Sequence, residues 1–251
     1  MDFTFEQYEE FLAFLASKKI KVFGILNWFE NNSSNGIIIR HDVDRKPKNA
    51  LKMALLEAKY DIKTTFYFRT TKNSFQTDII KKIVDLEHEI GYHYEDYARA
   101  NGDYPKAKLS FRDNLEKLRA YYNIKTVAAH GRPLSKFDSR DFWRNYAIEE
   151  FGLKAEALIS IDYTDIYYFT DTGRTWNSKG VNIRDNVTSY KKAEVNSTYE
   201  LIDFINNNKD KKIAIVAHPE RWSDSFSEHV ISTLKDHATN AVKRILISMR
   251  Q

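Results

Sequence analysis

Cysteine is absent from the sequence, so disulfide bonds and thiolate metal sites are excluded from the outset. Glycine and proline are scarce, with 8 and 4 residues, and no low-complexity tract marks a linker between domains. No apolar run in the sequence approaches membrane-spanning length. The chain starts Met1-Asp2-Phe3-Thr4, without the basic start of a signal peptide, so we expect a cytoplasmic location by default.

A concentration of charge of one sign is also missing. The formal net charge is +4, and acidic and basic residues are interspersed without a Lys/Arg block. We therefore expect no nucleic-acid partner, whereas an anionic substrate is compatible with the mild positive charge. With 251 residues, of which 42% are hydrophobic, the chain is long enough to bury a full core. We predict a single domain over residues 1–251, with an N-terminal helical extension over residues 1–35.

One stretch near the N-terminus organises the rest of the chain. A β-branched run, Ile37 to Ile39, is typical of a buried strand, and it leads directly to His41, Asp42 and Asp44. Pro47 follows and suits the first turn of a helix, where its missing N–H costs nothing. The polar residues should therefore lie between a strand and a helix, where parallel α/β proteins place their chemistry. The alternative is an ordinary turn in which Asp44 caps the helix.

Strand and helix patterns alternate along the chain, which predicts an α/β fold with a parallel sheet and right-handed crossovers. The predicted strands span residues 37–43, 62–68, 89–94, 126–130 and 212–218. The predicted helices span residues 48–60, 76–86, 105–122 (with Leu109 facing inward) and 199–206. A last helix and a last strand are predicted over residues 228–237 and 242–248.

Titratable side chains recur at the C-terminal ends of four predicted strands. They are Asp42, Asp44, His93, His130 and His218. A lone histidine at a strand end is most often a structural hydrogen-bonding group, but the ends of parallel strands converge on one face. This repeated placement therefore predicts one site. The remaining histidines considered, His88, His229 and His237, lie on predicted helices and are expected at the surface.

Imidazole nitrogens and carboxylate oxygens in this number suit zinc or another divalent transition ion. Two or three protein ligands with open positions would make a catalytic rather than a structural metal site. A second carboxylate could accept a proton from water, and a histidine on the other side could protonate a leaving group. The residues therefore favour metal-assisted hydrolysis.

Four segments together resemble motifs of the polysaccharide deacetylase, or NodB-homology, family, of which the chain would be a divergent member. Arg40-His-Asp-Val-Asp44 resembles the first motif in its Asp-x-Asp form, and Glu89-Ile-Gly-Tyr-His93 matches the start of the second. His130-Gly-Arg-Pro133 and Ala217-His-Pro219 resemble the third and last motifs. The resemblance extends to about Trp222 and implies a distorted (β/α) barrel with fewer than eight strands.

The resemblance also implies roles for single residues. Asp42 would be the catalytic base, while Asp44 and His93 would be metal ligands. Arg132 would orient the base or bind an anionic substrate. His218 would be the general acid.

The third metal ligand departs from the family pattern, because the family's second histidine falls on Tyr97. His130 could enter from the next strand, or Glu95 could turn in from the same loop. We predict His130, because a strand end is more rigid than a loop. A site that binds sugars without metal is the remaining alternative.

Two tryptophans are candidates for a sugar platform. Trp222 is favoured because it lies four residues past His218, and Trp176 is the second candidate. Packing in a half-buried position is the alternative for both.

The sequence thus predicts a metal-dependent hydrolase that removes an N-acyl group, taken to be acetyl, from an amino sugar. The cofactor would be a divalent ion, with zinc preferred and cobalt or nickel also suitable. The partner would be a carbohydrate, in the form of a nucleotide- or lipid-linked intermediate of surface-polysaccharide synthesis. The rival predictions are a metal-dependent glycosyltransferase using Asp42-Val43-Asp44 and a non-catalytic carbohydrate-binding pseudoenzyme.

Overall fold

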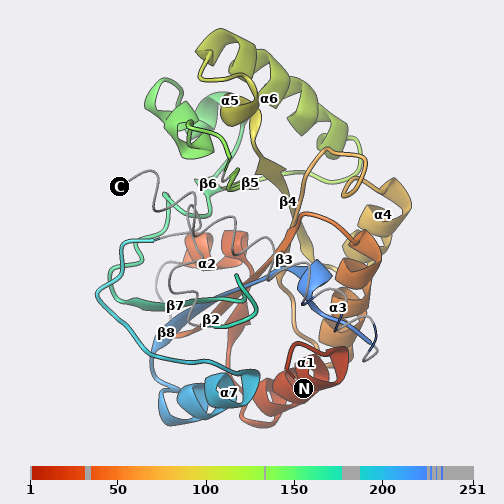
Figure 1. Ribbon diagram of the computed structural model, residues 1–251, viewed down its shortest axis with the longest axis vertical. Coiled ribbons are helices and arrows are strands. Elements are labelled where there is room, and N and C mark those ends of the chain that lie inside the picture. The colour runs from red at the N-terminus through yellow and green to blue at the C-terminus, as the bar shows by residue number, and fades with distance from the viewer. Residues whose placement is uncertain are drawn as a thin grey trace.

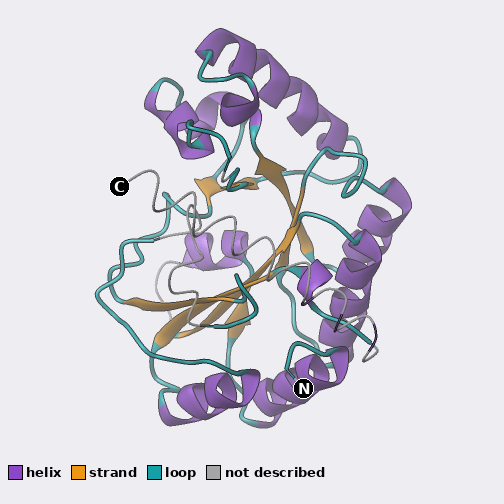
Figure 2. Cartoon of the chain, in the orientation of Figure 1, coloured by secondary structure: helices purple, strands orange, loops and turns teal. Residues whose placement is uncertain are grey.

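A parallel β-sheet with helices around it forms the centre of the protein (Figure 1, Figure 2). The structure is a computed structural model that describes residues 2–31, 35–132, 134–176 and 187–224, together with residues 227, 230 and 233. The strands are β1 Val22–Phe23, β2 Gly36–Val43, β3 Thr65–Phe68, β4 Glu89–Tyr94, β5 Thr126–Ala129, β6 Ala155–Glu156, β7 Ile166–Thr170 and β8 Lys212–Ala217. The helices are α1 Phe5–Ser17, α2 Ile25–Asn31, α3 Pro47–Lys59, α4 Thr77–Asp85, α5 Asp96–Arg99, α6 Tyr104–Arg119 and α7 Thr198–Asn207. Short 3₁₀ segments span Ser139–Arg144, Ile148–Phe151 and Pro219–Arg221.

The strands follow the order β6-β5-β4-β3-β2-β8-β7, and every pairing is parallel. The two-residue β1 pairs with the start of β2, beside this path. The direction of the strands turns between β7 and β4, so the sheet curls (Figure 1). No pairing between the described residues joins β6 to β7, so the barrel is incomplete. The predicted α/β fold, an incomplete barrel with fewer than eight strands along its path, is confirmed.

Strand β2 shows how the sequence pattern separates two cores. It is buried along its whole length because it lies between β3 and β8. Ile37, Ile39 and Val43 belong to the larger core, which includes residues of the surrounding helices. Ile38 belongs to the smaller core, together with Tyr67 of β3. Because successive side chains of a strand point to opposite faces, the even-numbered residues of β2 face the inside of the curled sheet.

The N-terminal segment packs into the same larger core. Helix α1 begins at a capping threonine, since the Thr4 side chain accepts a hydrogen bond from the backbone N–H of Gln7. Its apolar face is buried through Tyr8, Leu12 and Leu15. Helix α1 therefore contributes to the core of the domain.

Three sequence predictions need correction or fall outside the described residues. His88 is not at the surface: it is 1% exposed, and its ring contacts the Ala54 carbonyl oxygen at 3.1 Å. Leu109 does not face inward, because it is 67% exposed on α6. His229, His237 and the elements predicted over residues 228–237 and 242–248 lie outside the described residues, apart from residues 230 and 233. None of the helices in the described part of the chain is both long and apolar enough to span a membrane.

Candidate metal-dependent active site

The turn after β2 brings two carboxylates to the C-terminal edge of the sheet. Asp42 is the second-last residue of β2, and the backbone N–H of Asp44 donates to the Asp42 carbonyl oxygen at 3.1 Å. Lys46 then adopts a left-handed conformation with φ 51°, and Pro47 begins α3. No side chain caps this helix, so the reading of Asp44 as an N-cap is wrong and its carboxylate is free for another role.

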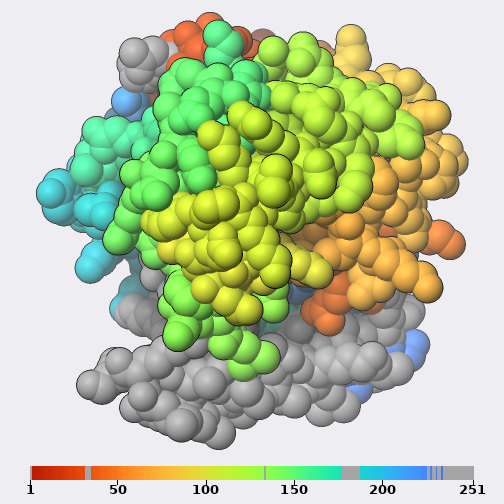
Figure 3. All heavy atoms as spheres, turned by 90° about the horizontal axis from the view of Figure 1, so that it is seen from above, coloured from red at the N-terminus to blue at the C-terminus, as the bar shows by residue number. Residues whose placement is uncertain are grey.

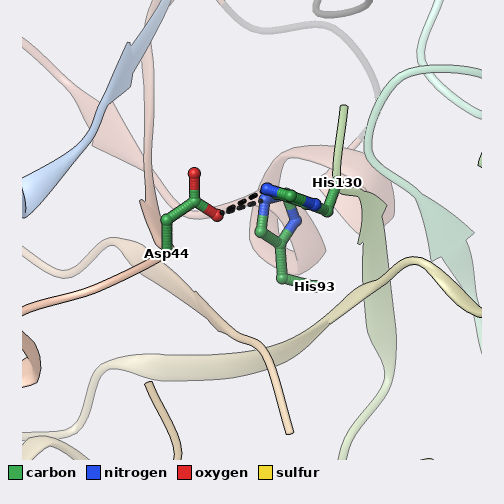
Figure 4. A group of neighbouring side chains, drawn as sticks. All are labelled: Asp44, His93 and His130. Atoms are coloured by element: carbon green, nitrogen blue, oxygen red, sulfur yellow. Dashed lines mark ion pairs between the residues drawn. The ribbon is translucent and has the colours of Figure 1, made fainter. Parts of the chain in front are cut away.

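Three predicted metal ligands meet at this edge from three strand ends. Asp44 Oδ1 lies 3.5 Å from His93 Nε2 and 3.2 Å from His130 Nε2 (Figure 4). Each of the three residues offers one possible ligand atom, and these three atoms all lie within 4.8 Å of one another. His93 belongs to β4 and His130 directly follows β5, so neighbouring strands position both rings.

The other nitrogen of each imidazole has its own partner. His93 Nδ1 lies 3.0 Å from the Ala128 carbonyl oxygen, which can only accept, so Nδ1 carries the proton. His130 Nδ1 lies 3.3 Å from Glu95 Oε2. Such partners fix the ring orientation and leave Nε2 as the ligand atom, as is usual for metal-binding histidines.

The electrostatics of the group also fit a cation. Burial alone would raise the pKa of Asp44, but the electrostatic attraction of His130, followed by that of His93, holds that pKa well below its usual range. Burial lowers the pKa of His130, but Asp44 and Glu95 outweigh it and raise the pKa to about 9. Asp44 Oδ1 is buried, and no described residue donates a well-formed hydrogen bond to it. A carboxylate oxygen and two imidazole nitrogens directed at one point form a donor set suited to zinc and related ions.

The two alternatives for the third ligand occupy other positions. Tyr97 packs against Tyr104, with ring centroids 4.6 Å apart, and Tyr104 is the first cause of a rise of the Tyr97 pKa to about 12. A phenol that resists ionisation is a poor metal ligand. Glu95 supports the group instead, because it contacts His130 and accepts a hydrogen bond of 2.7 Å from Arg69 Nη2. The structure therefore places His130, not Tyr97 or Glu95, beside Asp44 and His93.

Asp42 lies next to the metal-ligand group. Its Oδ2 is 3.8 Å from His93 Nε2 and 3.3 Å from Arg40 Nη2. Arg40 is 2% exposed and fills the inside of the sheet below Asp42, with its guanidinium carbon 6.0 Å from the centre of the Tyr67 ring. A guanidinium in this position donates to the Asp42 carboxylate and limits its orientations.

The motif resemblance implied that Arg132 either orients Asp42 or binds an anionic substrate. In the structure, Arg132 contacts a different carboxylate. Its Nε lies 3.7 Å from Glu95 Oε2, and its side chain is 39% exposed. Arg40 rather than Arg132 therefore pairs with Asp42, and the first part of the Arg132 prediction is wrong. Contact of Arg132 with an anionic substrate stays a prediction.

His218 approaches from the other side, at the end of β8. Its Nδ1 lies 2.6 Å from Asp171 Oδ1, and its backbone N–H donates to Asp171 Oδ2 at 2.8 Å. Asp171 is fully buried and also accepts from Arg221 Nη1 at 2.8 Å and Trp222 Nε1 at 3.0 Å. Burial and then Arg221 lower the pKa of His218, yet Asp171 and Asp42 outweigh them and raise it. His218 therefore tends to carry a proton, with Nε2 left to donate it.

The two candidate platform tryptophans are buried. Trp222 is 1% exposed and packs edge-on against Phe3 and Tyr8, while Trp176 is 4% exposed. An indole without an exposed face cannot stack on a sugar ring, so neither residue is placed to form the expected platform. The Trp222 indole instead holds Asp171 through its Nε1 hydrogen bond.

Three residues of the site were missed by the sequence analysis. Arg40 was quoted only as part of a motif, although a charged residue inside a buried strand should have predicted a paired role. Asp171 lies in an irregular stretch, where no periodicity indicates which side chains turn inward. Glu220 is buried with Oε2 unpartnered, and burial, followed by the charge of Asp44, raises its pKa to about 7.

Comparison with known proteins gives no family assignment from sequence. No protein-family model matches the chain. No curated protein matches it either. The similarity of the four motifs to the family is therefore too weak for these sequence comparisons to detect.

Comparison with solved structures gives distant matches. The wild-type pseudoenzyme BA3943 of carbohydrate esterase family 4, from Bacillus anthracis, is 14% identical over 81% of this chain and 60% of its own, with a TM-score of 0.42. A family 4 carbohydrate esterase from the same organism is 14% identical over 90% and 84%, with a TM-score of 0.40. PdaA of Bacillus subtilis, also a family 4 carbohydrate esterase, is 14% identical over 89% and 81%, with a TM-score of 0.42.

The chain spans about three fifths of the length of the BA3943 structures that it matches. The three structures named above are all from carbohydrate esterase family 4.

Proposed function

We propose that the protein is a metal-dependent hydrolase that removes an N-acyl group, taken as acetyl, from an amino sugar. The observation that supports the proposal is that a possible metal-ligand set, a further carboxylate and a carboxylate-paired histidine all lie at the C-terminal edge of the sheet. Asp44, His93 and His130 form a donor set for a divalent ion. Asp42 lies 3.8 Å from that set, and His218 has a buried carboxylate as its partner.

The residues supply what amide hydrolysis requires. A divalent ion held by Asp44, His93 and His130 would act as a Lewis acid on the amide carbonyl oxygen. Asp42, held by its contact with Arg40, accepts a proton from the attacking water. His218 donates the proton on Nε2 to the departing amine, because an amide nitrogen leaves only as the neutral amine. The C–N bond breaks, and the products are acetate and a free amino sugar.

The finer parts of the proposal concern the ion and the substrate. Two imidazoles and one carboxylate suit zinc, with cobalt or nickel as substitutes. We take the substrate to be an amino sugar linked to a nucleotide or a lipid, in surface-polysaccharide synthesis. The mild net charge of +4 supports an anionic carrier. A cytoplasmic location stays a prediction.

The two rival functions explain less of the site. A glycosyltransferase that uses Asp42 and Asp44 would leave the pairing of His218 with Asp171 unused. A pseudoenzyme would have no need for a proton donor held by a fully buried carboxylate. Both rivals make different predictions for metal content and product release, so one experiment separates them.

The test combines elemental analysis with an assay for acetate. Protein reconstituted with zinc, cobalt or nickel should bind about one ion per chain and release acetate from N-acetylglucosamine derivatives. Asp42→Asn should keep the ion and lose the activity. Metal binding without acetate release from any acylated amino sugar would favour the pseudoenzyme, and transfer of a sugar from a nucleotide donor would favour the glycosyltransferase.

A further inference from the structure

A cavity adjoins the proposed metal site on the side of α5 and α6. It has a volume of about 420 Å³, within the range of small-molecule sites. Its walls are the loop after β3 at residues 70–72, the end of β4, the last residue of α5 (Arg99), and one face of α6. His93 and Glu95 line it as well, so the cavity and the metal-ligand group share a side chain. In Figure 3, α5 and α6 in yellow to yellow-green lie beside the orange segment that carries this loop.

The loop after β3 offers two hydrogen-bond donors to the cavity. Lys72 is exposed, and its ammonium group makes no ion pair or hydrogen bond with any described residue. The Thr71 hydroxyl is buried without a hydrogen-bond partner. A buried hydroxyl is costly when unpaired, so an acceptor atom from a bound molecule would stabilise it.

The two carboxylates next to the cavity already have hydrogen-bond partners among the neighbouring residues. Glu95 Oε1 receives hydrogen bonds from Arg69 Nη2 at 2.7 Å and from Arg99 Nη1 at 2.9 Å. Asp96 is buried and accepts from Tyr92, Ser110 and Asn114. Neither carboxylate is left to pair with Lys72. The Arg99 guanidinium pairs with Glu95 through Nη1, but the side chain is 54% exposed and keeps further N–H donors at the edge of the cavity.

We propose that this cavity binds an anionic, oxygen-rich group of the substrate, either a phosphate or a carboxylate. The inference rests on the proposed function and narrows it: the substrate is an acylated amino sugar with a negative charge close to the amide. Lys72 supplies the opposite charge, and Thr71 and Arg99 supply directed donors, which is the combination that oxyanions require. A neutral glycan could accept from the Thr71 hydroxyl but would leave the Lys72 ammonium group without an opposite charge.

The test measures binding to the full chain carrying Asp42→Asn, which should not turn substrate over. The probes are N-acetylglucosamine, its 1-phosphate and the corresponding 6-carboxylate, titrated calorimetrically at low and high salt. We expect one or both anionic probes to bind about tenfold or more tightly than the neutral sugar, the scale of one charge-assisted hydrogen bond. The anionic probe whose affinity exceeds that of the neutral sugar by the larger factor identifies the source of the charge. This difference in affinity should shrink at high salt.

Single substitutions then test whether the higher affinity for the anionic probes depends on residues of the cavity. Lys72→Gln and Thr71→Val should each remove most of the preference for the anion and leave binding of the neutral sugar unchanged. The matched control is Lys154→Gln, which removes an exposed lysine just before β6. This lysine lies at the edge where the parallel strands begin, whereas the cavity lies at the edge where they end. Equal binding of all three probes, or an equal loss in the Lys154 variant, would overturn the proposal.

The outcome for catalysis is separate. Acetate release from the anionic sugars that is insensitive to Lys72→Gln would keep the proposed function and reject the anion site. Anion binding that depends on Lys72, without acetate release from any probe by the metal-loaded parent protein, would keep the site and reject the function.

Discussion

Replacing Asp171 by asparagine tests the proton donor directly. The wild-type carboxylate is fully buried and accepts four hydrogen bonds, from His218 Nδ1 and N–H, Arg221 Nη1 and Trp222 Nε1. His218 Nδ1 and Arg221 meet Oδ1, whereas the His218 N–H and Trp222 meet Oδ2. An asparagine has one oxygen, so in either orientation its NH₂ group faces two donors. The variant therefore loses the charge that holds the His218 imidazolium.

The size of the effect follows from that hydrogen bond. A hydrogen bond to a charged group contributes about 1.5–3 kcal/mol, which corresponds to roughly 10- to 200-fold in turnover. The same energy is about one to two pKa units. Without Asp171, burial and Arg221 remain as the causes that lower the pKa of His218. The general acid is active when protonated, so the fall of activity at high pH should begin one to two pH units lower.

The assay is the rate of acetate release against pH, with the His218 pKa measured independently by NMR. Asp165→Asn is the matched control, because this carboxylate lies just before β7 with a 71% exposed side chain paired to Lys191. Metal content should be unchanged in both variants. A folded Asp171→Asn protein with normal turnover and an unmoved His218 pKa would refute our reasoning. Slow turnover with an unmoved pKa would show that Asp171 is merely structural.

Three further predictions concern the metal and the base. His130→Ala should lower metal affinity by far more than Tyr97→Phe, because the tyrosine lies outside the ligand group; equilibrium dialysis that shows the reverse would exchange their roles. Since the pKa of His130 is raised to about 9 and only the neutral ring binds a metal, cobalt affinity should increase about tenfold per pH unit from about pH 7 to about pH 9. A flat absorption titration over this range would contradict that pKa. Asp42→Asn and His218→Ala should each reduce turnover by roughly a hundredfold or more while the ion stays bound. Loss of the ion in either variant, measured by elemental analysis, would make that residue a ligand.

The sequence was sufficient for the elements that carry a regular pattern. Strand β4 was predicted at its observed bounds, and the carboxylates at the C-terminal end of β2 were predicted beside the histidines at the ends of β4 and β5. These predictions succeeded because burial imposes a period on the sequence and because parallel strands end on one face. His130 could be chosen over Tyr97 by the same rule, since only one of them directly follows a strand.

The remaining site residues depend on contacts that no local pattern records. Asp171 is positioned by His218 and Trp222, about fifty residues further along the chain. Trp222 is buried by Phe3 and Tyr8, from the other end of the sequence. An aromatic residue near a catalytic histidine has the same local signature whether it stacks on a sugar or fills a core. Only the tertiary packing distinguishes the two, and here it buries the ring.

Strand β2 connects these contacts to the chemistry. Asp42 faces the inside of the curled sheet, and His41 faces the helices on the other side. There His41 Nε2 lies 2.8 Å from Glu57 Oε1 of α3, which also accepts a hydrogen bond of 2.5 Å from the Tyr8 hydroxyl of α1. All three side chains are buried, so an unpaired member would be costly and the strand cannot easily slide against the helices. A shift of one residue would also exchange the two faces and turn Asp42 away from His93. The buried network behind β2 therefore fixes the register on which the position of Asp42, the proposed base, depends.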